Sequence, residues 1–282
     1  MSFSEKTIQV NKYKWFYREA DLSEETSTDK PTIVFLHGIP SQSYCWGEML
    51  SAVGGKGFNA IAPDWLGMGF SDHPDKRDFK YTPDAFIEAL GDFLKELNIE
   101  ECFLVVQGFL GSVGIQYALR NSEQIKGLIL LNTPVSSKVK LPWIMKQWTI
   151  PLAGEMLTQD PLLVDRTLEG GSGFVINDEH LNIYRKPFLT SSSAGRSLQA
   201  ITKNLQLSKA MKEIETGLSN WEKPTLIIWG KEDPWLSIND AKNLTRKGNF
   251  QLIELPEAKH YPQEHWAEEV NENLVNFLLR KS

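Results

Sequence analysis

The amino-acid sequence predicts an α/β fold in which a mostly parallel, doubly wound sheet is interrupted by an inserted helical cap. Short continuous apolar runs alternate with amphipathic helical segments through residues 1–133 and again through residues 221–282. Strands that helices cover on both faces need such runs, and their alternation with helices is typical of a parallel sheet. Between residues 134 and 220 the chain is rich in Pro, Trp and Ser and has no clear strands. We therefore expect a core domain formed by the two outer ranges and a helical cap at 134–220.

The individual elements follow from the periodicity of apolar residues. The expected strands are residues 15–17, 32–36, 59–61, 103–106 and 128–131 before the cap, and 224–230 and 251–255 after it. Helices are expected where apolar side chains recur about every 3.6 residues. Two such stripes are Phe86, Leu90, Phe93, Leu94 and Leu97, and Val270, Leu274, Phe277 and Leu278. Each stripe predicts a helix that packs one face against the sheet.

The composition argues against several classes of function. The chain has 282 residues, of which 41% are hydrophobic and 23% charged, so it can bury a large core. A net charge of -6 without long Lys and Arg clusters argues against nucleic acid and anionic membranes as partners. The first residues lack the pattern of a signal peptide, and no apolar stretch approaches the roughly 20 residues of a membrane span. We expect a cytoplasmic protein with no transmembrane segment.

The sequence predicts neither a metal site nor a bound cofactor. The two cysteines, Cys45 and Cys102, cannot form a disulfide framework and lack the spacing of a zinc site, so both are expected to be buried and reduced. No pair of histidines with a carboxylate has the spacing of metal ligands. The glycine-rich segments around Gly108 and at 170–173 do not fit a nucleotide-binding fingerprint.

The segment from Leu104 to Ser112 has the pattern of a strand, a sharp turn and a helix. In a nucleophile elbow, such a turn holds the attacking side chain in a strained conformation above the sheet. Here the central residue of the turn is Gly108, which suits a strained backbone but has no attacking atom. Ser112 lies beyond the turn, where a small residue usually serves close helix packing, so we do not expect it to act as the nucleophile.

Four motifs resemble the α/β-hydrolase fold over nearly the whole chain, and within it the branch of haloalkane dehalogenases and epoxide hydrolases. They lie at residues 36–46, 62–72, 229–235 and 258–264. The resemblance assigns the acid and the histidine of a triad to Asp233 and His260, where the acid would fix the imidazole tautomer and stabilise its protonated form. Outside these motifs, Asp233 would be interpreted as a cap of the helix beginning near Ser237, and His260 as an ordinary loop residue.

Three positions depart from the dehalogenase pattern. The resemblance places an aspartate nucleophile at Gly108, a tryptophan halide ligand at Phe109 and an asparagine halide ligand at Ile39. Glycine cannot form the covalent ester, and the side chains of Phe and Ile donate no hydrogen bond. We therefore do not expect dehalogenation by the family mechanism, and the same loss counts against epoxide hydrolysis.

The resemblance also predicts what the pocket retains. It places the backbone N–H groups of Ile39 and Phe109 where this fold stabilises an oxyanion, and a main-chain donor survives a change of side chain. Because both side chains are apolar, a small hydrophobic molecule is the expected ligand. Five aromatic residues of the cap are candidate lining residues, although such residues as often form the cap's own core: Trp143, Trp148, Phe174, Tyr184 and Phe188.

Two functions remain open from the sequence. In the first, His260, oriented by Asp233, acts as a general base on water or on an acidic substrate, as related folds use a histidine–acid dyad without a covalent step. In the second, the chain is a catalytically inactive relative that binds a hydrophobic small molecule or a protein partner. Retention of the dyad favours the first function, and the combined changes at Ile39, Gly108 and Phe109 favour the second. The sequence does not predict the oligomeric state.

Overall fold

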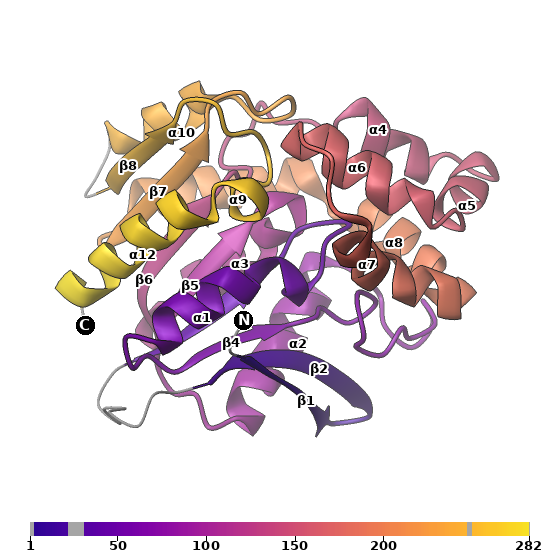
Figure 1. Cartoon of the computed structure of the whole chain (residues 1–282), viewed down its shortest axis with the longest axis horizontal. Coiled ribbons are helices and arrows are strands. Elements are labelled where there is room, and N and C mark those ends of the chain that lie inside the picture. Colours follow the sequence, from indigo (N-terminus) through magenta and orange to yellow (C-terminus); the bar gives the residue numbers. More distant parts are fainter. Residues whose placement is uncertain (1–2, 22–30, 247–249, 282) are drawn as a thin grey trace.

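The computed structural model describes residues 3–21, 31–246 and 250–281 and contains one eight-stranded sheet (Figure 1). In chain order its strands are β1 (Phe3–Val10), β2 (Tyr13–Ala20), β3 (Thr32–Leu36), β4 (Ala60–Pro63), β5 (Cys102–Gln107), β6 (Ile125–Leu131), β7 (Thr225–Gly230) and β8 (Phe250–Leu255). Their order across the sheet is β1-β2-β4-β3-β5-β6-β7-β8. The pairings of β2 with β1 and β4 are antiparallel, and the others are parallel. The predicted mostly parallel sheet is confirmed.

The first two strands form a hairpin that the apolar pattern predicted only in part. β2 contains the predicted run 15–17, whereas β1 was not predicted. Most side chains of β1 are exposed or half-buried, because it is an edge strand, and it therefore lacks the continuous apolar run of a covered strand. The tight turn between the strands places Asn11 at a φ of 53°, a conformation that asparagine tolerates better than most residues.

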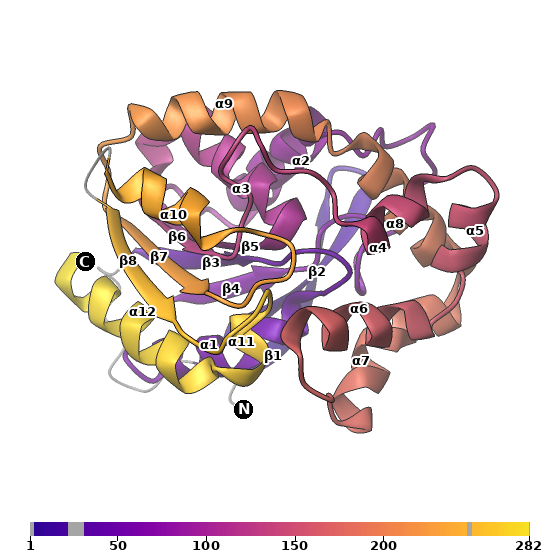
Figure 2. The ribbon, with the colours of Figure 1, turned by 90° about the horizontal axis from the view of Figure 1, so that it is seen from above.

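Helices cover both faces of the sheet (Figure 2). On one face lie α1 (Gly47–Gly54) and α12 (Ala267–Lys281), which pack against each other. On the other face lie α2 (Pro83–Glu96), α3 (Gly108–Arg120) and α9 (Leu207–Ser219), with α3 in contact with both of its neighbours. This is the doubly wound arrangement that the sequence predicts. Because helices cover both faces, the loops that follow the carboxyl ends of the parallel strands are where a site can form.

The two predicted apolar stripes are buried in helices. At the start of α2, Thr82 accepts a hydrogen bond from the Ala85 N–H and Pro83 occupies the first turn, as helix-start signals require. Four of the five stripe residues of α2 are buried, and Leu97, just past the helix end, is partly buried. All four stripe residues of α12 are buried. At about 1.5–3 kcal/mol for each fully buried large apolar side chain, these stripes hold both helices on the sheet.

Between β6 and β7 the chain forms five further helices before α9: α4 (Trp143–Lys146), α5 (Ala153–Thr158), α6 (Leu162–Ser172), α7 (Asp178–Thr190) and α8 (Ser192–Asn204). We call residues 143–204 the inserted segment, which lies beside the carboxyl ends of the parallel strands (Figure 2). The next helix, α9, packs against α3, and Glu213 of α9 pairs with Arg120 of α3. The predicted cap range 134–220 therefore includes a helix that covers the sheet.

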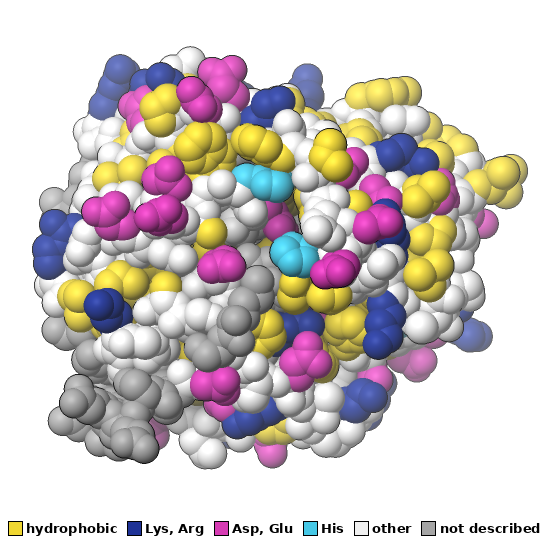
Figure 3. Space-filling model, in the orientation of Figure 1, with side chains coloured by type: hydrophobic (Ala, Val, Ile, Leu, Met, Phe, Trp, Pro, Cys, Tyr) yellow, Lys and Arg dark blue, Asp and Glu magenta, His cyan; other side chains and the backbone are white. Residues whose placement is uncertain are grey.

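Exposed apolar side chains are concentrated on the inserted segment, as the hydrophobic surface on the right of Figure 3 shows. Among the large hydrophobic residues that are exposed in the described part of the chain, Leu279 alone lies outside it, and the others are Trp143, Ile150, Leu152, Met156, Leu162, Phe174, Val175 and Leu189. In the described ranges, no helix has both the length and the apolar character that crossing a membrane requires.

Candidate active site

Five sequence-distant residues converge where the parallel strands end. Gly108 follows β5, Asn132 follows β6, and His37 follows β3. Asp233 lies in the loop between β7 and α10 (Ile238–Thr245), and His260 lies between β8 and α11 (Pro262–His265). Because the carboxyl ends of parallel strands share one edge of the sheet, the loops after them bring these residues together.

Asp233 and His260 form a buried pair. His260 Nδ1 lies 2.8 Å from Asp233 Oδ2, and neither side chain has exposed surface. Oδ2 also accepts a hydrogen bond from Asn132 Nδ2 at 2.7 Å. A carboxylate oxygen accepts hydrogen bonds, so Nδ1 is the donor of this contact, and Nε2 is the ring nitrogen without a partner among the described residues. The pair has the geometry of a histidine that is oriented by an acid.

The second carboxylate oxygen of Asp233 orders the turn ahead of α10. Oδ1 accepts from the N–H groups of Trp235 at 2.7 Å and Leu236 at 3.1 Å. The N-cap of α10 itself is Ser237, whose side chain accepts from the Asn239 N–H. The cap role that the sequence left open for Asp233 therefore belongs to Ser237, and Asp233 holds the preceding turn while it contacts the histidine.

His260 Nε2 faces Gly108 and has no hydrogen-bond partner among the described residues. Gly108 has a φ of 68°, in the left-handed region that favours glycine. A Cβ at this position would lie 3.4 Å from Nε2 and 3.3 Å from Gly38 Cα, with no other heavy atom within 4 Å outside its own helix and chain neighbours. A side chain at position 108 would thus begin in contact with the imidazole.

Three aromatic rings surround His260. The ring centroids of Trp235, Tyr261 and Phe109 lie 4.6, 4.8 and 5.8 Å from that of the imidazole. Helix α6 closes over them, because a Cβ at Gly171 would lie only 2.4 Å from the Tyr261 ring and 2.7 Å from the Trp235 ring. The inserted segment therefore packs directly on the site, in apolar surroundings where electrostatic interactions are stronger than in water.

The two predicted main-chain donors lie close to the turn after β5. Phe109 is the second residue of α3, and the first N–H groups of a helix have no partner within it. The Ile39 carbonyl accepts a hydrogen bond from the Tyr261 hydroxyl at 2.9 Å, which holds its loop. A Cβ at the preceding Gly38 would lie 2.7 Å from Gln107 Oε1, so this loop passes very near the end of β5. Oxyanion binding by the two N–H groups remains a prediction.

His37 has a structural role in the same loop. Its Nδ1 donates to the Gly38 carbonyl at 2.8 Å, and its Nε2 accepts from the Trp65 N–H at 3.2 Å. The Trp65 ring N–H in turn donates to the His37 carbonyl at 3.0 Å. Burial lowers the pKa of His37, which keeps the ring in the neutral form that this pattern of one donor and one acceptor needs.

Sequence patterns did not predict two of the polar residues that hold the pair. Asn132 bridges to Gly230, accepting from its N–H at 2.8 Å and donating to its carbonyl at 3.2 Å, while it also contacts Asp233. Gln107 Nε2 donates to the His260 carbonyl at 2.8 Å. Both residues stand at the carboxyl end of a buried strand, and that position is the signal that could have identified them.

The predicted aromatic lining residues are dispersed over the inserted segment. Trp148 and Tyr184 are buried, Phe188 is partly buried, and Trp143 and Phe174 are 66% and 44% exposed. None of them is among the described ring contacts of His260. Trp143 starts the short helix α4, and Phe174 follows the end of α6, where its ring centroid lies 4.4 Å from that of His265.

The other candidate nucleophiles are occupied or protonated. Ser112 Oγ donates to the Phe109 carbonyl of its own helix at 2.7 Å. Burial raises the pKa of Cys45 well above its usual range and that of Cys102 to about 12, so neither thiol ionises near neutral pH. Both cysteines are buried and free, as predicted. Within the described ranges, no three His, Cys, Asp or Glu side chains are grouped so that they could hold a metal ion.

Glu264 makes a pH-sensitive contact between α11 and the inserted segment. The Tyr184 hydroxyl of α7 donates to its carboxyl group, which is enclosed although the residue keeps some exposed surface. Burial raises the pKa of Glu264 to about 7 from an ordinary value of 4.5. Because its pKa is raised, this carboxyl group binds a proton more tightly in the folded state than in the unfolded state. Its contribution to the free energy of unfolding is therefore fully present below the unfolded-state pKa and is lost as the pH rises through the folded-state pKa.

We therefore expect the wild type to lose stability between about pH 4.5 and pH 7 relative to Glu264→Gln, by roughly 1–3 kcal/mol. Glutamine keeps an acceptor for the Tyr184 hydroxyl but does not titrate. Urea unfolding of both proteins near pH 5 and near pH 8 measures the difference. Parallel pH profiles for the two proteins would contradict the assignment.

Comparison with known proteins agrees with this fold. Residues 31–265 match the family described as the alpha/beta hydrolase fold. A haloalkane dehalogenase 2 from Mycobacterium bovis is 25% identical over 246 residues, which cover 83% of this chain and 83% of the relative. A cis-3-alkyl-4-alkyloxetan-2-one decarboxylase from Shewanella oneidensis is 29% identical over 272 residues, which cover 87% of this chain and 81% of the relative.

A solved structure shows the same architecture. The crystal structure of a haloalkane dehalogenase from Bradyrhizobium elkani superposes with a TM-score of 0.88 at 22% sequence identity, covering 99% of this chain and 98% of the other. At this identity the match establishes the fold alone. The matched family spans most of the chain, and its sheet, its helical layers and the loops at its carboxyl edge are those described above. The chain therefore belongs to the alpha/beta hydrolase fold family.

Proposed function

We propose that this protein is an enzyme that acts on a small hydrophobic substrate by general-base chemistry of the His260–Asp233 dyad, without a covalent intermediate. The observation that carries the proposal is the free Nε2 of His260. This atom is buried, has no hydrogen-bond partner among the described residues and faces the space beside Gly108. A buried polar atom without a partner costs free energy, so its retention favours a role in binding or moving a proton.

In the proposed reaction, water or an acidic group of the substrate lies between Gly108 and His260. Nε2 removes its proton, and Asp233 stabilises the imidazolium that forms. If water is the reactant, its oxygen bonds to the substrate carbonyl carbon, and the N–H groups of Ile39 and Phe109 stabilise the resulting oxyanion. The imidazolium then returns the proton to the leaving group when the bond to that group breaks. His260 thus completes the cycle neutral.

The covalent mechanism is disfavoured by the residues at three positions. Gly108 has no atom that can attack, and we infer that it occupies the nucleophile position because a side chain there would begin 3.4 Å from Nε2. Phe109 and Ile39 have no side-chain donor with which to hold a departing halide. Two of the proteins compared above are named as haloalkane dehalogenases, but these changes argue against that activity here.

A cap function of the inserted segment supports a hydrophobic substrate. The carbonyl of Gly171 in α6 accepts from the His260 N–H at 2.9 Å, and the rings of Trp235 and Tyr261 fill the space between α6 and the imidazole. Because His260 has no exposed surface, substrate entry requires movement of these rings or of α6. We propose that the inserted segment, and not α9 of the predicted range 134–220, acts as the cap and closes on the bound molecule.

The closed site is also the observation that favours the second candidate function. In that case the protein is a catalytically inactive relative that binds a hydrophobic small molecule or a protein partner. A fully buried histidine that is enclosed by Phe109, Trp235 and Tyr261 can serve packing alone, without reaching a substrate. The fold itself hosts both kinds of protein, so the decision depends on the chemistry of the site.

The discriminating experiment compares the wild type with Gly108→Asp on one substrate panel. The panel contains an aryl ester, an epoxide, a haloalkane, a 1,3-diketone and a dialkyl oxetan-2-one, which is the compound class in the name of the Shewanella relative. Proton removal from the diketone is measured by hydrogen–deuterium exchange. We expect the wild type to turn over at least one ester, lactone or diketone and no haloalkane. If Gly108→Asp turns over a substrate and the wild type turns over none, the proposal is overturned and the binding function is favoured.

A further inference from the structure

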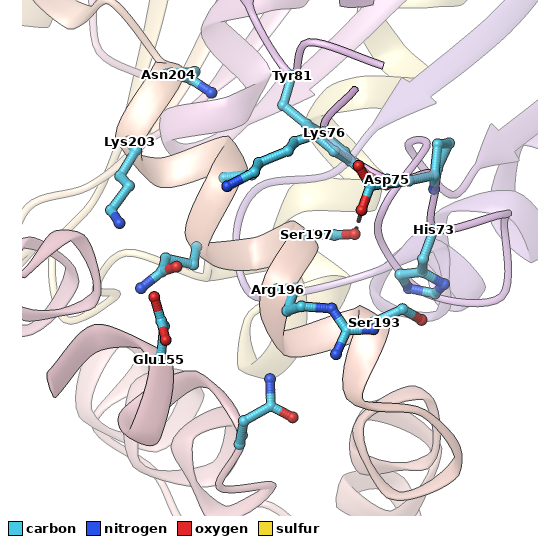
Figure 4. A pocket seen from close by; sticks show the side chains of 14 residues that line it. His73, Asp75, Lys76, Tyr81, Glu155, Ser193, Arg196, Ser197, Lys203 and Asn204 are labelled. Atoms are coloured by element: carbon cyan, nitrogen blue, oxygen red, sulfur yellow. Dashed lines mark hydrogen bonds between the residues drawn. The ribbon is translucent and has the colours of Figure 1, made fainter. Parts of the chain in front are cut away.

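A cavity of about 560 Å³ lies between α8 and the loop after β4 (Figure 4). Its volume falls within the range of about 300–1,000 Å³ that is usual for small-molecule sites. None of Gly108, Asp233 and His260 lines it. The cavity is thus distinct from the candidate active site, and the proposed function gives it no role.

Hydrogen bonds pin the two walls of this cavity together. The Tyr81 hydroxyl donates to the Pro74 carbonyl at 2.6 Å, so Ser197 Oγ of α8, at 2.9 Å, must donate to Tyr81. Near the end of α8, Asn204 Nδ2 donates to the Lys80 carbonyl at 3.2 Å. Tyr81 also has a φ of 54°, a strained conformation for a residue other than glycine. The space between the walls is therefore preformed.

Three cationic side chains line the cavity. Lys76 comes from the loop after β4, and Arg196 and Lys203 come from α8. Lys76 and Lys203 extend toward the open space from its two sides (Figure 4). None of these three residues forms an ion pair within the described part of the chain. Arg196 donates to the Ser192 hydroxyl at 2.7 Å.

The acidic residues of the lining do not balance these cations. Asp75 Oδ1 accepts from both the N–H and the Nε of Arg77, at 3.0 and 2.8 Å, so its charge is already neutralised. These bonds lower the pKa of Asp75 and keep it ionised. Glu155 of α5 is the remaining acid of the lining. The cavity therefore has an excess of positive charge, although the whole chain has a net charge of -6.

Two buried polar atoms without partners lie in the walls of the cavity. Gln199 is only 8% exposed, lines the cavity and has no hydrogen-bond acceptor for its Nε2 among the described residues. His73 lines the same cavity, and its buried Nε2 also lacks a partner. Each of these nitrogens has almost no accessible surface, so neither contacts a ligand in the open space, and the three cations carry the binding site.

We propose that this cavity binds a small anion that carries carboxylate or phosphate groups. Lys76, Arg196 and Lys203 supply charge-assisted hydrogen bonds, which are roughly twice as strong as neutral ones. A bound anion would link α8 of the inserted segment to the loop after β4 and stabilise their packing.

Calorimetric titration of the full chain with inorganic phosphate, and separately with succinate, tests the site at an ionic strength held constant with sodium chloride. We expect saturable binding of at least one anion, and the preferred anion identifies the ligand group. The double variant Lys76→Ala/Lys203→Ala should raise its Kd roughly tenfold or more. Lys138→Ala/Lys140→Ala removes the same charge from two exposed lysines that do not line the cavity and should leave the Kd unchanged.

A third variant is a control in the cavity wall that leaves the charge unchanged. Gln199→Met keeps the approximate volume and should leave the Kd unchanged, because the amide nitrogen that it removes has almost no accessible surface. Circular dichroism and the anion-free unfolding temperature confirm that each variant is folded. Absence of binding by the wild type, or equal weakening by Lys138→Ala/Lys140→Ala, would overturn the proposal. Failure of the active-site proposal would not affect this result, because no residue is shared.

Discussion

Replacement of His260 by alanine is expected to lower kcat/KM by about 10²–10⁴-fold on any substrate that the wild type turns over. The imidazole provides the only free nitrogen base that faces the space beside Gly108 among the described residues. Without Nε2, no group at this position can accept the proton, and the N–H donors of the neighbouring loops cannot replace it. Steady-state kinetics on the best substrate of the panel measure the loss.

Two further variants make this result specific. Asp233→Asn keeps the volume but removes the charge that stabilises the imidazolium, so we expect a similarly large loss. Its amide also turns a donor toward groups that donate to both Asp233 oxygens, so we expect a lower unfolding temperature. Ser112→Ala is the matched control, because Ser112 Oγ is bonded to the Phe109 carbonyl and is buried in α3. It should leave kcat/KM unchanged. Full activity in His260→Ala would contradict the dyad, and loss of activity in Ser112→Ala would identify a serine nucleophile instead.

Replacement of Gly230 by alanine should destabilise the fold by about 3 kcal/mol or more. The added Cβ would lie 2.2 Å from the Lys259 carbonyl oxygen and 2.6 Å from the backbone of Ala258, so backbone rather than a flexible side chain must move. Gly230 also exchanges two hydrogen bonds with Asn132, the residue that contacts Asp233. The strain would therefore displace the loop of His260 as well as the end of β7.

Gly170→Ala is the matched control for this variant. Gly170 lies in α6, and a Cβ there would meet no atom within 4 Å. Because alanine is the better helix former, we expect no loss of stability and a gain of up to about 1 kcal/mol. Denaturant unfolding of both variants measures the two free energies. Equal stabilities for Gly230→Ala and Gly170→Ala would show that β7 and the loop after β8 separate at little cost.

Much of the fold could be predicted because apolar periodicity reports burial. The covered central strands have continuous apolar runs, and the stripes of α2 and α12 recur at helical spacing. β1 was missed for the same reason, since an edge strand with one exposed face has no such run. The position of α9 against α3 was also not evident, because an amphipathic helix packs equally well on a sheet or within an inserted segment.

Site residues that belong to a sequence motif could be predicted, whereas those whose role depends on a tertiary contact could not. Asp233 and His260 occupy recognisable turns, and the structure brings them to 2.8 Å. Asn132 and Gln107 carry no motif, and their roles depend on partners about one hundred residues or more away. The five aromatic lining candidates stay a prediction, since composition alone does not tell whether such a side chain lines a ligand site or packs in the cap's own core.

The sequence by itself determined that position 108 has no side chain and that the strands and helices alternate, because residue identity and local periodicity are properties of the chain. The tertiary structure alone decided that Nε2 of His260 faces that glycine without a partner, that α6 closes over the imidazole, and that Lys76 and Lys203 share a cavity. These features arise from close packing between segments far apart in the chain, where free energy depends on distances of a few ångströms.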